Sequence, residues 1–114
     1  MKFSGSLKLN HIFQRLYRSR GFSDGYLCLY ARKNRSEKNR IGFTVSKKLG
    51  HAVVRNRTRR RLREVYRLNE SKFLPGYDVV VVARSRAVEA PFENLTHSFL
   101  KLAGKAGILR EEEA

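Results

Sequence analysis

The sequence predicts an α/β fold in which helices and a sheet pack as a two-layer sandwich. Two segments alternate between apolar and polar residues, a third is continuously apolar, and segments with helical periodicity lie around them. The 114 residues suffice for one modest hydrophobic core, so we expect a single domain over residues 1–114. The expected order is helix, strand, strand, helix, strand, helix, and a short extra strand near residues 21–24 is allowed for.

The first predicted element is a short helix over residues 11–19, which Asn10 can cap. One apolar stripe of this helix suits the core. A second stripe, formed by Phe13 and Tyr17, lies beside it. These two aromatic side chains can either widen the core or stand at its edge next to basic residues, and the pattern leaves both interpretations open.

Two strands are predicted next, over residues 25–33 and 40–47, because apolar residues recur there at every second position. The polar segment 34–39 between them contains turn-forming residues, and it predicts a hairpin. If the two strands pair, the face turned away from the core carries a shared set of aromatic, basic and small side chains: Tyr26, Cys28, Tyr30 and Arg32, with Arg40, Gly42, Thr44 and Ser46.

The segment 52–68 has the periodicity of an amphipathic helix with an unusual excess of arginine. Its apolar stripe consists of Val54, Thr58, Leu62, Val65 and Tyr66. The opposite side carries Asn56, Arg57, Arg59, Arg60, Arg63 and Arg67, with Arg55 and Arg61 on the flanks. Solvated helices normally mix charges of both signs, whereas Glu64 is the single acid here. The unmixed charge indicates a surface that binds a polyanion.

Two further elements complete the predicted fold. Residues 77–83 form an apolar, β-branched run that is typical of a buried central strand. A last helix begins near Pro91, a residue suited to a first turn. Its apolar face is formed by Phe92, Leu95, Phe99 and Leu102.

The composition points to an anionic partner. The formal net charge is +15, and the apolar content of 41% is that of a folded domain. An excess this large attracts nucleic acid first and an anionic membrane surface second. The single cysteine, Cys28, excludes an internal disulfide, and no apolar run approaches the length of a membrane span. We therefore expect a cytoplasmic protein with no membrane partner.

Catalytic arrangements are absent from the sequence. The three histidines have no metal-ligand spacing, there is no glycine-rich phosphate loop, and the few acids do not cluster as a metal-dependent nuclease requires. If the protein serves a reaction, the reacting groups belong to a partner.

The central segment carries a specific motif. It reads GFTVSKKLG over residues 42–50, AVVRNR over 52–57 and RRRLRE over 59–64. This segment resembles the RNR signature of the bacterial ribonuclease P protein subunit. The resemblance extends over nearly the whole chain, through an N-terminal FQRLY at 13–17, LY at 29–30 and YDVV at 77–80.

The resemblance implies a protein that joins a large catalytic RNA, which removes the 5′ leader from precursor tRNA. The chemistry and the Mg²⁺ it needs are then held mainly by the RNA, so no residue of the protein is catalytic. It also implies one protein copy in the ribonucleoprotein and a left-handed strand–helix–strand crossover. The family's contacts to catalytic RNA carry over to Lys47, Lys48, Arg55, Asn56, Arg57, Arg59, Arg60 and Arg63. Its leader contacts carry over to Phe13, Tyr17 and Tyr30, and no metal ligand can be placed.

Two other functions compete with this one. A structural RNA-binding protein, such as a ribosomal protein, needs the basic helix but not an aromatic cleft. A DNA-binding domain would place the helix in a major groove, but Asn56 is the one base-reading amide among its arginines. The aromatic face of the sheet is the feature that separates the subunit of an RNA enzyme from a structural RNA-binding protein.

Overall fold

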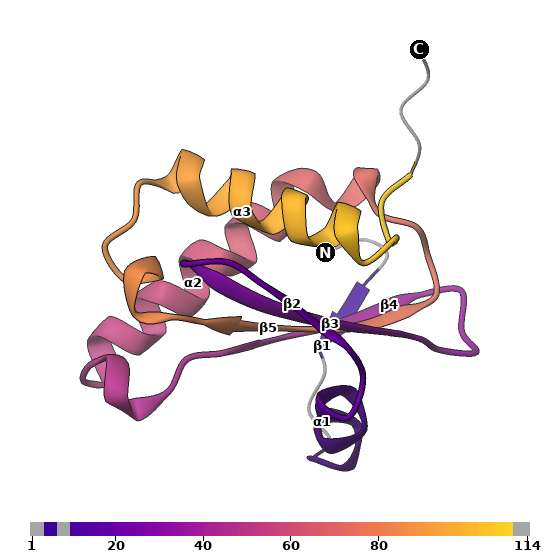
Figure 1. The fold of residues 1–114 in the computed structure, drawn as a ribbon, viewed down its shortest axis with the longest axis horizontal. Helices are drawn as coiled ribbons and strands as arrows, with labels where there is room; N and C mark the ends of the chain where they lie inside the picture. The colour runs from indigo at the N-terminus through magenta and orange to yellow at the C-terminus, as the bar shows by residue number, and fades with distance from the viewer. Residues whose placement is uncertain (1–3, 7–9, 111–114) are drawn as a thin grey trace.

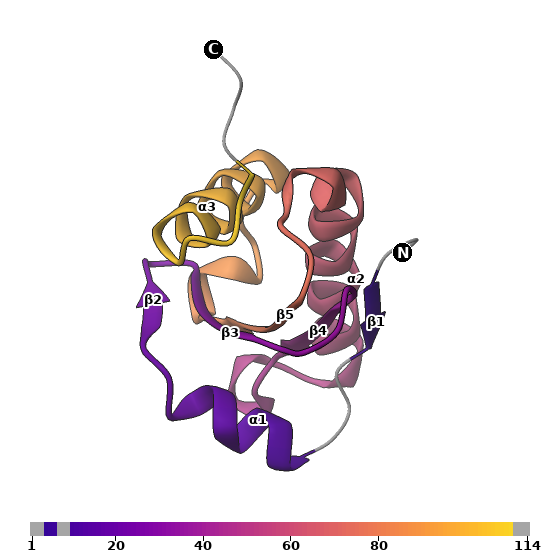
Figure 2. The same ribbon diagram turned by 90° about the vertical axis from the view of Figure 1, so that its right-hand side faces the viewer.

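The chain forms one mixed sheet with helices on both of its faces (Figures 1 and 2). The computed structural model describes the backbone of residues 4–6 and 10–110 and the side chains of residues 14–110. The strands are β1 (Ser4–Ser6), β2 (Gly21–Ser23), β3 (Leu27–Lys33), β4 (Asn39–Thr44) and β5 (Tyr77–Ala83). The α-helices are α1 (Asn10–Tyr17), α2 (Ala52–Asn69) and α3 (Phe92–Lys105). Short 3₁₀ turns lie at η1 (Lys47–Leu49), η2 (Glu70–Lys72) and η3 (Ser85–Ala87).

β5 is the central strand, as its composition predicts. The sheet order is β1-β4-β5-β3-β2, with β5 parallel to β4 and antiparallel to β3. Val79 and Val81 are buried on one face and Val80 on the other, because helices cover both. The extra strand allowed for near residues 21–24 is confirmed as β2, and β1 is a strand that the sequence pattern did not predict.

The predicted hairpin between β3 and β4 is wrong. These strands do not pair, because β5 is inserted between them. The connecting loop instead passes over the start of β5, where the backbone amide of Asn34 donates to the Gly76 carbonyl at 2.7 Å. Both faces of β5 are apolar, and its position in the centre of the sheet buries both of them. A β3–β4 hairpin would have left β5 at an edge of the sheet. The outward residues of β3 and β4 therefore share a face, but with β5 between them.

The helices divide unequally between the two faces of the sheet. Figure 2 shows α2 and α3 on one face and α1 on the other. The main core lies under α2 and α3, where Tyr66, Phe73 and Phe99 pack with ring centroids 5.2 to 6.1 Å apart. On the α1 face, a smaller cluster joins Leu16, Val80 and Tyr30. The predicted α/β sandwich is confirmed, and α1 adds a helix on its far side.

The crossover from β4 through α2 to β5 has an uncommon hand. β4 and β5 are adjacent and parallel, and α2 lies over the main-core face. Figures 1 and 2 together show that, with α2 toward the viewer and the strands pointing up, β5 lies to the left of β4. This is a left-handed crossover, whereas about 98% of such connections are right-handed. The expectation that the resemblance gave for this feature is confirmed.

Candidate RNA-binding surfaces

The arginines of α2 are turned outward because the opposite stripe of the helix is buried in the core. Thr58, Leu62, Val65 and Tyr66 are each at most 1% exposed, and the Thr58 hydroxyl donates to the Val54 carbonyl at 2.9 Å. The buried stripe fixes the rotation of the helix about its axis. The sequence-predicted stripe is thereby confirmed, with Val54 half-buried at its end.

A tight turn joins the two lysines of η1 to the start of α2. Lys47 and Lys48 are both exposed, and the Ser46 hydroxyl accepts from the Lys48 amide at 3.2 Å. Gly50 has φ +150°, and a Cβ there would lie 2.9 Å from the Cβ of Val54. Glycine is required at this position, since side chains are disfavoured by both the backbone angle and the contact. Lys47, Lys48, Arg57, Arg59, Arg60 and Arg63 form what we call the basic helix surface.

The predicted RNA-binding residues differ in their own contacts. Arg59 donates to the Asn56 side chain at 2.9 Å, and Arg57 makes a long contact of 3.5 Å with the Val88 carbonyl. Arg60 and Arg63 are exposed, with no hydrogen-bond partner found among the described residues. Their guanidinium groups are therefore available to phosphate, which they can grip through two parallel hydrogen bonds.

Arg55 and Arg61 occupy the flanks of α2, as predicted, and both are half-buried. Arg61 donates to the carbonyls of Val88 and Ala90, which ties the β5–α3 connection to α2. The Nε of Arg55 is buried and has no acceptor among the described residues. Arg61 thus has a structural role, while the Nε–H of Arg55 has no acceptor among the described residues and can still donate a hydrogen bond.

A second candidate surface lies on the α1 face of the sheet. Tyr17 and Tyr30 meet edge to face with ring centroids 5.2 Å apart. Tyr17 is 44% exposed, and Tyr30 is half-buried against Leu16 and Val80. We call Tyr17 and Tyr30 the aromatic sheet surface. Phe13, the third predicted leader contact, belongs to α1, but its side chain lies outside the described residues.

The environment of Tyr30 favours a neutral ring. A hydrogen bond with Cys28 raises the pKa of Tyr30, and burial and the neighbouring Cys28 and Tyr17 raise it further. The phenol therefore keeps its proton at neutral pH. A neutral aromatic face beside cations is suited to stacking of unpaired bases.

Tyr26 does not belong to this surface, so its predicted place on the outer face is wrong. It precedes β3 and packs against the main core, and Asn94 of α3 donates to its hydroxyl at 3.2 Å. The guanidinium of Arg86 lies over the Tyr26 ring, 4.6 Å from its centroid. The chain has not yet entered the regular strand at Tyr26, so alternation does not extend to it.

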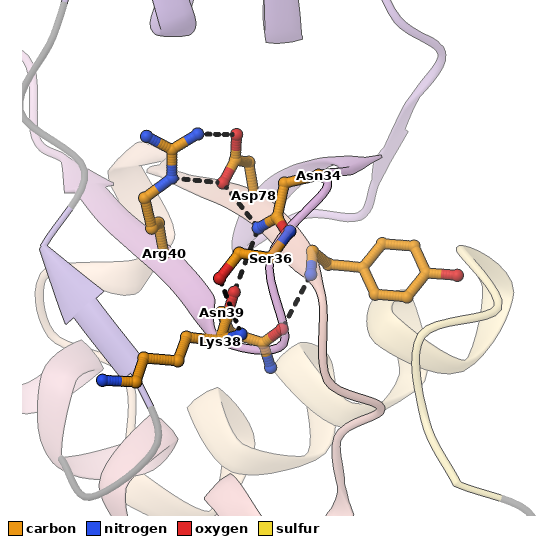
Figure 3. Close-up of polar contacts among 7 residues, drawn as sticks. Asn34, Ser36, Lys38, Asn39, Arg40 and Asp78 are labelled. Atoms are coloured by element: carbon orange, nitrogen blue, oxygen red, sulfur yellow. Dashed lines mark hydrogen bonds and ion pairs between the residues drawn. The ribbon is translucent and has the colours of Figure 1, made fainter.

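A polar network fixes the end of the α1 face (Figure 3). Arg40 donates to both carboxylate oxygens of Asp78, at 2.7 and 2.6 Å, and Asn34 donates to the same carboxylate at 3.0 Å. Asn39 is buried and links the Leu74 carbonyl to the Tyr77 amide. These contacts hold the loop after β3 in place. Sequence reasoning did not assign Arg40 a partner, because its register with Asp78 depends on β5 lying next to β4.

The described residues contain neither a cluster of metal-ligating side chains nor a helix that could span a membrane. No group of three or more histidine, cysteine, aspartate or glutamate side chains among them could hold a metal ion. None of the helices within this part of the chain is long and apolar enough to cross a membrane.

Comparison with known proteins identifies the family. The family model described as Ribonuclease P matches residues 1–107. Ribonuclease P protein components of Natranaerobius thermophilus and Clostridioides difficile are 39% and 40% identical to the chain, over 93% and 90% of its length and 93% and 91% of theirs.

Solved structures agree with this assignment. The ribonuclease P protein of Staphylococcus aureus superposes with a TM-score of 0.82 at 30% identity, covering 92% of this chain and 97% of that one. The protein from Thermotoga maritima gives 0.80 at 27% identity, covering 88% and 96%. By sequence and fold, this chain belongs to the family of ribonuclease P protein components, which function in tRNA processing.

Proposed function

We propose that this chain is the protein subunit of a ribonucleoprotein in which the basic helix surface binds the catalytic RNA. The observation that carries this proposal is the charge of α2, which holds seven arginines and one acid, Glu64. Glu64 is already paired with Arg67, so it does not neutralise the rest of the helix. Structured RNA supplies the phosphates that such a surface needs, and each phosphate it neutralises releases counterions.

We propose further that the aromatic sheet surface binds the single-stranded 5′ leader of precursor tRNA. Tyr17 and Tyr30 offer ring faces and edges, and Leu16, which packs against Tyr30, lines a pocket with Arg15 and Arg32. Aromatic rings with cations nearby suit unpaired bases and not a regular duplex. Phe13 is proposed for the same role from its position in the motif. A structural RNA-binding protein would have no use for this second surface.

In this proposal the protein assists the reaction and does not perform it. The carboxylates of the described residues do not cluster, so the Mg²⁺ ions that activate water and stabilise the leaving oxygen are assigned to the RNA. The protein contributes by binding the leader, which favours precursor over product. It acts in the cytoplasm as one copy in each complex.

Reconstitution tests the proposal. The protein is combined with a bacterial ribonuclease P RNA of a relative, and leader removal is measured at low Mg²⁺ with and without protein. We expect the protein alone to leave the precursor intact and to stimulate cleavage by the RNA. Absence of stimulation over a range of protein and Mg²⁺ concentrations would refute the proposed function.

A further inference from the structure

A pocket at one end of the sheet has no assigned role. β4 and β5 are parallel and end on the same side, and β3, which is antiparallel to β5, begins there. The segments that precede β3 and follow β4 and β5 therefore meet, at the left end of the sheet in Figure 1. They enclose about 460 Å³, and the lining includes Tyr26, Lys48, Leu49, Arg86, Glu89 and Pro91. This volume falls within the roughly 300 to 1,000 Å³ of small-ligand pockets.

The pocket is continuous with the basic helix surface. Lys48 belongs to that surface and also lines the pocket. Arg57, a second member of the surface, lies 3.5 Å from the carbonyl of Val88, which lines the pocket as well. An RNA strand bound to the basic helix surface can therefore place a nucleotide in the pocket without leaving that surface.

The pocket presents a planar cation that is held on an aromatic ring. The guanidinium of Arg86 lies over the Tyr26 ring and donates to the Tyr26 hydroxyl at 3.3 Å. Gly25 leaves room for it, since a Cβ at Gly25 would lie 2.6 Å from Nη1 of Arg86. Arg86 is exposed, so its guanidinium can also stack on an unpaired base.

Glu89 adds a carboxylate to otherwise basic surroundings. It is exposed and forms no hydrogen bond or ion pair with another of the described residues. A carboxylate repels phosphate, but it can accept two parallel hydrogen bonds from adjacent donors. Guanine carries such a pair, N1–H and N2–H, on its Watson–Crick edge, whereas the other bases place a donor next to an acceptor there. The lining therefore matches guanine better than it matches a phosphate alone.

We propose that this pocket binds an unpaired guanine of the catalytic RNA. Arg86 stacks on the base, Glu89 accepts from its N1–H and N2–H, and Lys48 pairs with its phosphate. Leu49 and Pro91 supply apolar walls. The inference rests on the proposed function, because it takes the RNA on the basic helix surface to be the catalytic RNA. It adds recognition of one base to a surface that otherwise recognises charge.

Glu89→Gln gives the sharpest test, because electrostatics and base recognition predict opposite signs. Removal of a negative charge from a basic surface should raise affinity for the catalytic RNA slightly, whereas loss of the guanine acceptor should lower it by about fivefold or more. The matched control is Glu93→Gln, which removes an exposed acid from the first turn of α3, outside the pocket. The control should stay within about twofold of wild type.

Two substitutions of Arg86 separate stacking from charge. Arg86→Lys keeps the positive charge but has no planar group, so it should lose affinity for the catalytic RNA by about fivefold or more, as Arg86→Ala should. Full affinity in Arg86→Lys would mean that only charge matters at this position, and it would overturn the inference.

Kethoxal, which modifies N1 and N2 of unpaired guanines, identifies the nucleotide. At saturating protein, one guanosine of the catalytic RNA should be protected by wild type and reactive in the complex with Glu89→Gln. Inosine lacks the N2 amine. Inosine at that position should weaken wild-type binding and remove the difference between wild type and Glu89→Gln, because the two changes delete the same contact.

The outcomes distinguish this inference from the proposed function. An affinity of Glu89→Gln equal to that of Glu93→Gln, identical kethoxal patterns with wild type and Glu89→Gln, or protection found in the precursor tRNA instead would each overturn the pocket assignment. Failure of the wild-type protein to bind the catalytic RNA would refute the proposed function itself. If wild type binds this RNA and stimulates cleavage while the pocket variants match it, only the pocket assignment fails.

Discussion

The basic helix surface and the α1 face of the sheet both present cations, yet they are assembled differently. The first lies mostly on one helix, and its side chains are placed by the burial of Leu62 and Val65 on the other side of that helix. The second draws Tyr17 from α1, Tyr30 from β3 and Arg40 from β4, and it exists only because β5 joins these elements. A local surface can be altered by surface substitutions alone, whereas a composite surface is coupled to the packing beneath it. The two should therefore respond differently to mutation.

The largest effect is expected from reversing charge on the basic helix surface. Arg60→Glu/Arg63→Glu should lower affinity for the catalytic RNA by about 100-fold or more, because charge-assisted contacts are lost and repulsion is added. Both residues are exposed, so thermal unfolding should be nearly unchanged. The matched control is Lys105→Glu/Arg110→Glu. Similar losses in both variants would mean that only net charge matters and that α2 has no special role.

Truncating Tyr30 should have the next largest effect. Tyr30→Ala removes a stacking surface worth about 1 to 3 kcal/mol per base, so precursor affinity should fall about 5- to 150-fold. Catalytic-RNA affinity should stay within about twofold of wild type. Tyr30→Phe keeps the ring and should retain most of the precursor affinity. If the phenylalanine variant is as weak as the alanine variant, stacking is not the source of the binding energy.

The carboxylate of Asp24 lies away from the basic helix surface, so substituting it should change the stability of the fold without changing RNA binding. Asp24 accepts from the Ser98 hydroxyl at 2.6 Å and from the backbone amides of Tyr26 and Leu27, and it pairs with Lys101 at 3.1 Å. Burial alone would raise the pKa of Asp24, but these contacts together outweigh it and lower the pKa from 3.8 to about 2. A lowered pKa means that the ionised carboxylate stabilises the fold above pH 3.8 and that this stabilisation is lost as the pH falls toward 2.

We expect this contribution to be about 2 kcal/mol. Urea unfolding from pH 5 to pH 2 should show wild type losing that much more free energy of unfolding than Asp24→Asn. At neutral pH, folded Asp24→Asn should bind both RNAs like wild type. Parallel pH profiles for the two proteins would remove Asp24 as the anchor between α3 and the segment that precedes β3.

The smallest effect is expected from Glu64. Its carboxylate pairs with Arg67 on the exposed side of α2, and the hydrogen bond from Arg67 lowers the pKa of Glu64, which keeps it ionised. Glu64→Gln should release Arg67 and raise catalytic-RNA affinity about twofold, with little change in thermal stability. Gel-shift titrations at low salt would detect this gain. A loss of affinity would indicate that the ion pair itself positions the helix on RNA.

The contrast between the two surfaces also explains what the sequence could predict. The arginines of the basic helix surface follow from a single helical periodicity, and the burial of Thr58, Leu62, Val65 and Tyr66 confirms it. The central position of β5 follows equally from its composition. Each of these inferences depends on residues close together in the chain.

The arrangement of the α1 face could not be obtained in this way. Alternation correctly placed Tyr30 and Arg32 on one face of β3, but the pairing of β3 with β4 was wrong because sequence adjacency favoured a hairpin. The Arg40–Asp78 contact joins residues 38 apart in the chain, and no local pattern indicates it. The left-handed crossover was likewise beyond pattern reasoning, which favours the opposite hand.

The central claim is that the two surfaces bind different RNAs. The ratio of the dissociation constants for mature and precursor tRNA tests this claim most directly. With the catalytic RNA saturated by protein, dissociation constants for precursor and mature tRNA are measured for wild type, Tyr30→Ala and Arg60→Glu/Arg63→Glu. Our account predicts that the preference for precursor collapses toward one in Tyr30→Ala and persists in the α2 variant once its weaker assembly is overcome by concentration. An equal collapse in both variants would contradict the separation of the two surfaces.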